Sequence, residues 1–91
     1  MRTDLQHDPE ARRFSVAVDG NLAVVDYELR DGIMTIVHTG VPPAIGGRGI
    51  AADLTRAALT HARERGWRVR PRCAYAAAFM RRHPEYADLM A

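Results

Sequence analysis

The sequence predicts an α/β protein with a mixed, mainly antiparallel sheet of four strands and two helices. Over the first forty residues apolar side chains recur at every second position, and Asp-Gly turn signals interrupt them, as in an antiparallel meander. Further along, the apolar period changes to about 3.6 residues, which is typical of an amphipathic helix. The 91 residues, 47% hydrophobic and 26% charged, are expected to form one domain, 1–91.

The first half of the chain contains the expected meander. The predicted strands are residues 13–18, 22–29 and 33–41. Asp-Gly between the second and third strands is a strong hairpin signal. Strict alternation in the third strand would place Met34, Ile36 and His38 on one face. Residues 1–12 have no clear period and contain a proline, so we expect a loose lead-in there.

The second half is expected to begin where Pro42 and Pro43 end the sheet pairing, because proline cannot donate to a ladder. A long helix is predicted over 49–65, with Gly66 as its C-terminal stop. A short strand, 67–71, should then lie parallel to the third strand, since a helix joins the two.

A second helix is expected over 74–82, and Pro84 would end it. In the tail that follows, Tyr86 and Leu89 are expected to pack back onto the core. No internal repeat and no linker is visible in the sequence.

The charge is distributed unevenly, and all 13 basic residues are arginine. Residues 1–40 hold four Arg and seven Asp or Glu, a net charge of −3, whereas residues 41–91 hold nine Arg and four acids, a net charge of +5. The basic half suits an anionic ligand; it would also suit nucleic acid, although its aromatic residues are spaced like core residues. One cysteine cannot form an internal disulfide, so a cytoplasmic location is expected. Neither a signal peptide nor a membrane span is expected.

The glycine-rich stretch before the long helix is the first candidate binding site. Gly46, Gly47 and Gly49 leave backbone N–H groups unshielded, and a helix N-terminus attracts anions such as a diphosphate. Arg48 can add a charge-assisted hydrogen bond. The stretch is not a P-loop, because the chain contains no lysine. A connection without any ligand remains an alternative, since glycine is also the usual residue of tight turns.

The same stretch resembles the acetyl-CoA loop of the GCN5-related N-acetyltransferases, Q/R-x-x-G-x-G/A. Gly49, Ile50 and Ala51 match its second half, and Gly46 stands where Gln or Arg is usual. The segments 38–42, 47–51, 71–73 and 81–86 together resemble the very short acetyltransferase-like proteins related to the bacterial YjdJ type. This likeness spans about residues 14–89.

The resemblance implies a minimal acetyltransferase core that takes acetyl-CoA as its acyl donor. It also implies which residues bind this substrate. They are Thr39 and Val41, through their main chain along the pantetheine arm, and Gly46, Gly47, Arg48, Gly49, Ile50 and Ala51 around the diphosphate. The acceptor would be an unknown amine on a small molecule or a protein. No membrane partner is expected, and nucleic acid is the less favoured one.

Cys73 is the first candidate catalytic residue. It lies between a predicted strand and a predicted helix, where the helix N-terminus favours a thiolate. The resemblance places a cysteine here, near the acetyl thioester, where it would either take the acetyl group covalently or line the pocket. A small buried residue with no chemical role is the alternative.

His38 is the second candidate, because imidazole exchanges protons near neutral pH and can deprotonate an attacking amine. Its alternative role is to fix the end of its strand. No His, Cys, Asp or Glu pair has metal-ligand spacing, so no metal is expected. The sequence therefore favours an acetyl-CoA-dependent N-acyltransferase, and the alternative is a CoA-binding or interaction module without catalysis.

Overall fold

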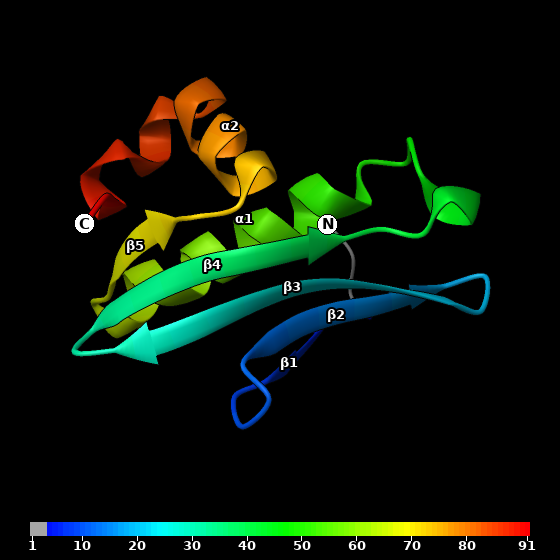
Figure 1. The fold of residues 1–91 in the computed structure, drawn as a ribbon, viewed down its shortest axis with the longest axis horizontal. Helices are drawn as coiled ribbons and strands as arrows, with labels where there is room; N and C mark the ends of the chain where they lie inside the picture. The colour runs from blue at the N-terminus through cyan, green and yellow to red at the C-terminus, as the bar shows by residue number, and fades with distance from the viewer. Residues whose placement is uncertain (1–3) are drawn as a thin grey trace.

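A five-stranded sheet in the order β1-β2-β3-β4-β5 organises the fold (Figure 1). The structure, a computed structural model, describes residues 4–91. Its strands are β1 (Gln6–Asp8), β2 (Arg13–Val18), β3 (Asn21–Arg30), β4 (Ile33–Gly40) and β5 (Arg68–Pro71). Its helices are α1 (Ile50–Arg65), α2 (Ala74–Arg82) and the short 3-10 helices η1 (Pro43–Ile45) and η2 (Pro84–Leu89). The predicted α/β class with a mainly antiparallel sheet is confirmed.

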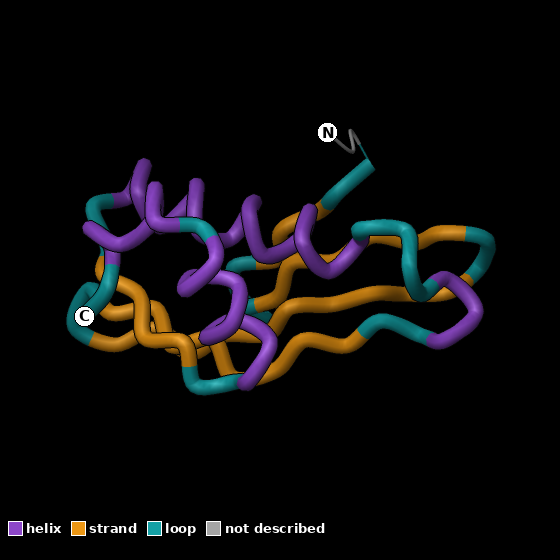
Figure 2. The backbone as a smooth tube through the Cα atoms, turned by 90° about the horizontal axis from the view of Figure 1, so that it is seen from above, coloured by secondary structure: helices purple, strands orange, loops and turns teal. Residues whose placement is uncertain are grey.

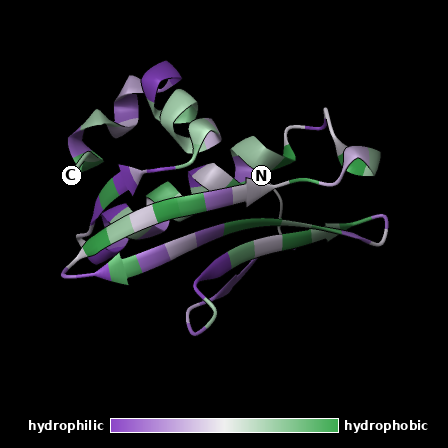
Figure 3. Cartoon of the chain, viewed as in Figure 1, coloured by the Kyte–Doolittle hydropathy of each residue, from purple (hydrophilic) through white to green (hydrophobic). Residues whose placement is uncertain are grey.

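Helix α1 covers one face of the sheet, and α2 lies beyond β5 (Figures 1 and 2). We call the face under α1 the covered face; it carries the buried side chains of Val25, Tyr27 and Ile36. The opposite face, called the open face, carries polar residues such as Glu28 and Arg70 in the alternate positions. Hydrophobic and hydrophilic residues accordingly alternate along the strands (Figure 3).

Tight turns set the antiparallel meander. Asp19 and Gly20 join β2 to β3 with φ of 52° and 77°, and Asp31 and Gly32 join β3 to β4 with φ of 53° and 74°. Two successive positive φ values define the two-residue turn whose twist matches that of adjoining strands. The predicted hairpins are therefore confirmed.

The sheet contains one strand more than the four predicted. Gln6–Asp8 pairs antiparallel with β2, and His7 lies opposite Phe14. The prediction of a loose lead-in over residues 1–12 was thus wrong for β1, while Met1–Thr3 lie outside the described residues. A three-residue strand is too short for alternation to be visible, and tertiary contacts of its middle residue hold it in place.

A gap opens between β4 and β5. The two strands pair in parallel, as predicted, but their pairing ends at Ile36 and Pro71, whereas β4 continues to Gly40. The N–H groups of Arg72 and Cys73 both donate to the Ile36 carbonyl, at 3.0 and 3.1 Å. The chain then turns into α2, so the second half of β4 has β3 beside it on one edge and this gap on the other.

A β-bulge in β4 reverses the expected orientation of its second half. Tyr27 of β3 pairs with Ile36, and the next residue, Asp26, pairs with His38, which leaves Val37 as the extra residue. Because paired residues share a face, Thr39 lies on the covered face and His38 on the open face. The expectation that His38 shares a face with Met34 and Ile36 was therefore wrong.

The core lies between the covered face and the helices. α1 contributes buried side chains at the helical spacing, including Ile50, Leu54 and Ala58, and ends at Gly66, whose φ is 74°. Tyr86 and Leu89 of η2 are 8% and 5% exposed, which confirms that the tail packs onto the core.

Candidate functional site

The glycine loop connects β4 to the start of α1 and leaves that helix end open. Gly47 and Gly49 have φ of 76° and 74°, and a Cβ at either position would meet nothing within 4 Å. Glycine is therefore favoured here by backbone conformation and not by lack of space. Gly49 is the N-cap of α1, and no side chain caps the helix. The amides of Ile50 and Ala51 have no partner within the helix and are available to an anion.

A shallow pocket of about 260 Å³ lies over this helix end. Its lining consists of Val41, Ile45, Gly46, Gly47, Gly49, Ile50, Ala51, Ala52 and Tyr75. Six of the eight residues predicted to bind the cofactor thus line one pocket, and no carboxylate is among its described lining residues. The uncapped end of α1 and a lining without a carboxylate fit a diphosphate, although Asp53 stands in the first turn of the helix.

Tyr75 from α2 closes this pocket, and sequence reasoning missed it. Its four-residue spacing to Phe79 suggested a core position, but its side chain is 37% exposed and reaches the glycine loop. Partial burial raises the pKa of the Tyr75 phenol, while Arg82 and Arg56 act in the opposite direction. The phenol is therefore neutral and can donate a hydrogen bond.

Arg48, the seventh predicted binding residue, points to the β2–β3 turn. Its Nη1 donates to Oδ2 of Asp19 at 2.8 Å, and both side chains are largely exposed. An exposed ion pair of this kind contributes less than about 1 kcal/mol. The pair therefore orients the guanidinium without preventing it from turning to a ligand in the loop.

Cys73 and Thr39 meet at the gap between β4 and β5. The Cys73 Sγ lies 3.4 Å from the Thr39 Oγ1 and also accepts a hydrogen bond from the Ala76 N–H at 3.4 Å. Cys73 is the N-cap of α2, so its sulfur faces the unpaired amides of a helix end. The sulfur is partly exposed and free of any disulfide. The sulfur thus lies where the N-terminus of α2 supplies a hydrogen-bond donor to it.

The Thr39 side chain adds a contact that the sequence did not indicate. The resemblance implied a role for its main chain, and the bulge at Val37 is what turns its hydroxyl toward the sulfur. A hydroxyl at this distance can donate to a thiolate. Thr39, the eighth predicted binding residue, therefore lies at the cysteine and outside the lining of the glycine-loop pocket.

The two predicted catalytic residues lie on opposite faces of the sheet. Cys73 contacts Thr39 on the covered face, and His38 is exposed on the open face beside the Asp26 row. A Cβ added at Gly40 would lie 2.8 Å from the His38 Nε2, so the small residue makes room for this ring. His38 is therefore placed to act on a group arriving from the open face and not on the sulfur.

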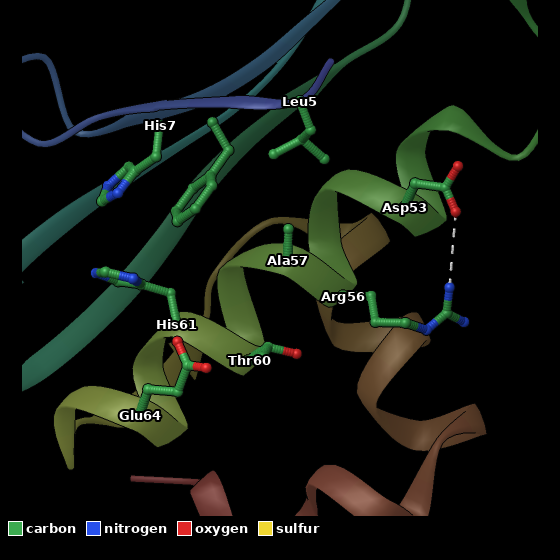
Figure 4. Close-up of a pocket in the computed structure, with 9 residues that line it drawn as sticks. Leu5, His7, Asp53, Arg56, Ala57, Thr60, His61 and Glu64 are labelled. Carbon is green, nitrogen blue, oxygen red and sulfur yellow. Dashed lines mark ion pairs between the residues drawn. The ribbon is translucent and has the colours of Figure 1, made fainter. Parts of the chain in front are cut away.

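A second hollow lies on the other side of α1, away from Cys73. It has a volume of about 510 Å³ and an apolar floor that includes Phe14. His7 and His61 point toward each other across it, with ring centroids 4.6 Å apart (Figure 4). Asp53 and Arg56 form an ion pair at its rim. It contains none of the predicted site residues.

Residues 4–91 contain neither a metal-binding cluster nor a helix that could span a membrane. There is no cluster of three His, Cys, Asp or Glu residues arranged to hold a metal ion. No helix in this part of the chain has the length and apolarity needed to cross a bilayer.

Comparisons with known proteins show the family to which the chain belongs. Residues 13–89 match the family model described as GCN5-related N-acetyl-transferase. The chain is 37% identical over 83 residues to Protein NATD1 of Bos taurus, an alignment that covers 88% of this chain and 74% of that protein. Human Protein NATD1 is 35% identical over 83 residues, with the same coverage. The chain therefore belongs to the GCN5-related N-acetyltransferase family.

A solved structure supports the same assignment. The solution structure of a GCN5-like protein from Staphylococcus aureus matches with a TM-score of 0.76 and 27% identity, covering 99% of this chain and 91% of that one. The match includes nearly all of the fold described above, so the trimmed sheet with two main helices has a solved counterpart.

Proposed function

We propose that this protein transfers an acetyl group from acetyl-CoA to an amine, with Cys73 at the reacting centre. The observation that carries the proposal is that β4 connects three features: the gap along its second half, the contact of Cys73 with its residue Thr39, and the loop that leads to the open end of α1. Membership of the N-acetyltransferase family supports the acyl-donor chemistry. The amides of Gly47 to Ala51 would bind the diphosphate, and Thr39 and Val41 would align the pantetheine arm.

In the covalent route, the Cys73 sulfur attacks the thioester carbonyl carbon and forms a new C–S bond. The bond from that carbon to the CoA sulfur breaks, and CoA leaves as a thiolate that takes up a proton. The amine then attacks the acetyl-cysteine, its new N–C bond replaces the C–S bond, and the amine gives up a proton. Backbone N–H groups at the gap would stabilise the oxyanion in both steps.

In the direct route, the amine attacks the thioester itself and Cys73 only lines the pocket. His38 would accept the amine proton in either route, since it lies on the face from which an amine can approach without passing α1. Both routes use the same cofactor-binding residues, so cofactor binding is tested first.

Calorimetry with acetyl-CoA tests the cofactor site. Gly49→Asp places a carboxylate at the open end of α1 and should weaken binding by about tenfold or more. Gly66→Asp is the matched control, because Gly66 ends the same helix with the same φ of 74° and also has open space around it. It should carry the same backbone strain and bind as the wild type. Equal affinity in both variants would contradict the proposal.

Mass spectrometry after incubation with acetyl-CoA separates the two routes. An acetyl group on the Cys73 peptide that disappears when an amine is added would support the covalent route. Transfer without this adduct would assign Cys73 to the pocket wall. Binding of CoA with no transfer to a broad amine panel would favour a non-catalytic CoA-binding module.

A further inference from the structure

The open face of the sheet contains a polar concavity that the proposed cofactor site does not use. Its volume is about 680 Å³, within the range of small-molecule sites. Its lining consists of Arg12, Glu28, Arg30, Asp31, Ile33, Thr35, Arg70 and Arg72. Four guanidinium groups and two carboxylates give it a net charge of 4 − 2 = +2.

The pairing of the strands brings these side chains together. Glu28, Thr35 and Arg70 lie in one row across β3, β4 and β5, and Arg30 lies beside Ile33 in the next row. Thr35 is 9% exposed and forms part of the floor. Arg12 reaches the same region from the turn between β1 and β2. Figure 1 looks onto this face, with α1 behind the sheet.

The four arginines have no ion-pair partner among residues 4–91. The ion pairs of arginine found there belong to Arg13, Arg48, Arg56 and Arg63. Glu28 and Asp31 line the same concavity without forming an ion pair with its arginines. Glu28 and Asp31 offset only half of the four positive charges, so an anion bound among the arginines relieves the remaining repulsion and gains several charge-assisted hydrogen bonds.

The concavity ends beside the reacting centre. Arg72 immediately precedes Cys73, and the N–H groups of both donate to the Ile36 carbonyl at the start of the gap. His38 lies on the same open face, next to the gap. A ligand held by the arginines therefore approaches the gap from the face opposite α1.

We propose that this concavity binds the acceptor, and that the acceptor is a small amine carrying a phosphate group. The arginines bind the phosphate in the bidentate geometry that guanidinium favours, and the amine extends toward the gap and His38. Phosphate binding by the arginines does not depend on the proposed acetyl transfer. The assignment of this site to the acceptor rests on that transfer. The size of the concavity favours a small molecule over a polymer.

Binding is tested with inorganic pyrophosphate followed by amide NMR at low salt. We expect shift changes at Thr35 and Arg70 that persist in Gly49→Asp, because that variant alters only the glycine loop. The double variant Arg70→Gln/Arg72→Gln should lose about tenfold in affinity at this site. The control Arg81→Gln removes an exposed arginine of α2 and should bind as the wild type.

Three outcomes of the binding experiment would overturn the proposal. In the first, pyrophosphate changes the amide shifts of the glycine loop only, and these changes disappear in Gly49→Asp. Arg81→Gln could weaken binding as much as the double variant, which would indicate a general charge effect. An affinity found only for an RNA oligonucleotide or an acidic peptide, and rising with its length, would assign the face to a polymer.

Transfer is tested with a matched pair of acceptors, phosphoethanolamine and ethanolamine. We expect the higher kcat/KM for phosphoethanolamine, and a loss of that preference in Arg70→Gln/Arg72→Gln. A preference for ethanolamine would overturn the inference and leave acetyl transfer intact. If neither amine is acetylated while pyrophosphate still binds the arginines, the phosphate site stands and its assignment to the acceptor falls.

Discussion

The two faces of β4 beside the gap carry different kinds of side chain. On the covered face, Thr39 contacts Cys73, and the surrounding side chains are apolar and packed against α1. On the open face, His38 lies next to Asp26 and the arginine concavity. These two residues are neighbours in sequence, and the bulge at Val37 determines which one faces which side.

The difference teaches how a thin domain can keep two substrates apart. A single-layered sheet has two faces, but it is too thin to form a deep pocket. If the acyl donor enters from the side of α1 and the acceptor from the open face, each surface needs residues for one substrate only. The gap between β4 and β5 is where the two would meet. The following predictions test this separation.

The largest effect on cofactor affinity is expected from deleting Val37. This residue has no partner in β3, so its removal leaves Ile36 and His38 opposite the adjacent residues Tyr27 and Asp26. The strand would straighten, continue beside β5 and narrow the gap, because a bulge bends its strand. We expect the fold to persist and the affinity for acetyl-CoA to fall by about 10²-fold, roughly 2.7 kcal/mol.

Two measurements check the Val37 prediction. Circular dichroism should show an unchanged fold for the deletion, and calorimetry should show the lost affinity. Val37→Ala keeps the bulge and should bind normally. Full binding by the deletion variant would show that the bulge is not what keeps the gap open.

Replacing Cys73 separates its structural and chemical roles. Cys73→Ala removes the cap of α2 and should lower the free energy of unfolding by about 0.5 to 1 kcal/mol. Cys73→Ser keeps a capping atom and should be nearly as stable as the wild type. If the covalent route operates, both variants should lose transfer by about 10²-fold or more. Denaturant unfolding and rate measurements check this, and an active Cys73→Ala would exclude the covalent route.

A moderate effect is expected from Gly40→Ala on the open face. The added methyl group would lie 2.8 Å from the His38 Nε2, so the ring must move. If His38 accepts the amine proton, we expect the rate to fall by about tenfold, less than for full loss of a general base. The double variant with His38→Ala should be no slower than His38→Ala alone. Additive losses would mean that Gly40 acts independently of the histidine.

The smallest effect concerns the pH dependence of stability through His7 on β1. Burial lowers the pKa of His7 from its ordinary value of 6.5, and the positive charge of His61 lowers it further, while Asp8 opposes this. The unfolded chain therefore binds the proton first as the pH falls. The contribution of neutral His7 to stability is complete above about pH 6.5 and is lost as the pH falls below it.

The neutral ring explains the geometry of this cluster. His7 stacks on Phe14 with centroids 4.0 Å apart, and its Nε2 forms a hydrogen bond of 2.6 Å with the Tyr27 hydroxyl. His7→Phe retains the stack and cannot titrate. Denaturant midpoints at about pH 7.5 and pH 5.5 should differ less in this variant than in the wild type. An equal pH dependence would assign the effect to other groups.

Most of the fold could be predicted because each long element has a periodic pattern and a marked end. The strand 13–18 and the helix 74–82 were predicted with the bounds that the structure has. β1 could not be predicted, because three residues carry no period and its stability depends on contacts of His7 with residues distant in sequence. Similarly, nothing in an alternating pattern marks the bulge at Val37.

The part of the candidate site that depends on the main chain could be predicted. The part that depends on the orientation of side chains was less predictable. Glycines before a helix indicated an open N-terminus, and the residues from Gly46 to Ala51 line one pocket, with the exception of Arg48. The relation of His38 to Cys73 follows from the bulge and could not be foreseen. The arginines at positions 68, 70 and 72 alternate, which is a sign of one strand face, but the sequence interpretation did not place them in a binding site.

The ion pair between Arg48 and Asp19 has a consequence for how cofactor occupancy can be observed. A diphosphate in the glycine loop would compete with Asp19 for the same guanidinium, and the 2.8 Å contact would be exchanged for a contact to the ligand. The β2–β3 turn would then lose this ion pair whenever the glycine loop binds a ligand. Its Asp19 and Gly20 amides thus become a spectroscopic reporter of loading, and the Gly66 amide at the other end of α1 serves as the silent internal reference.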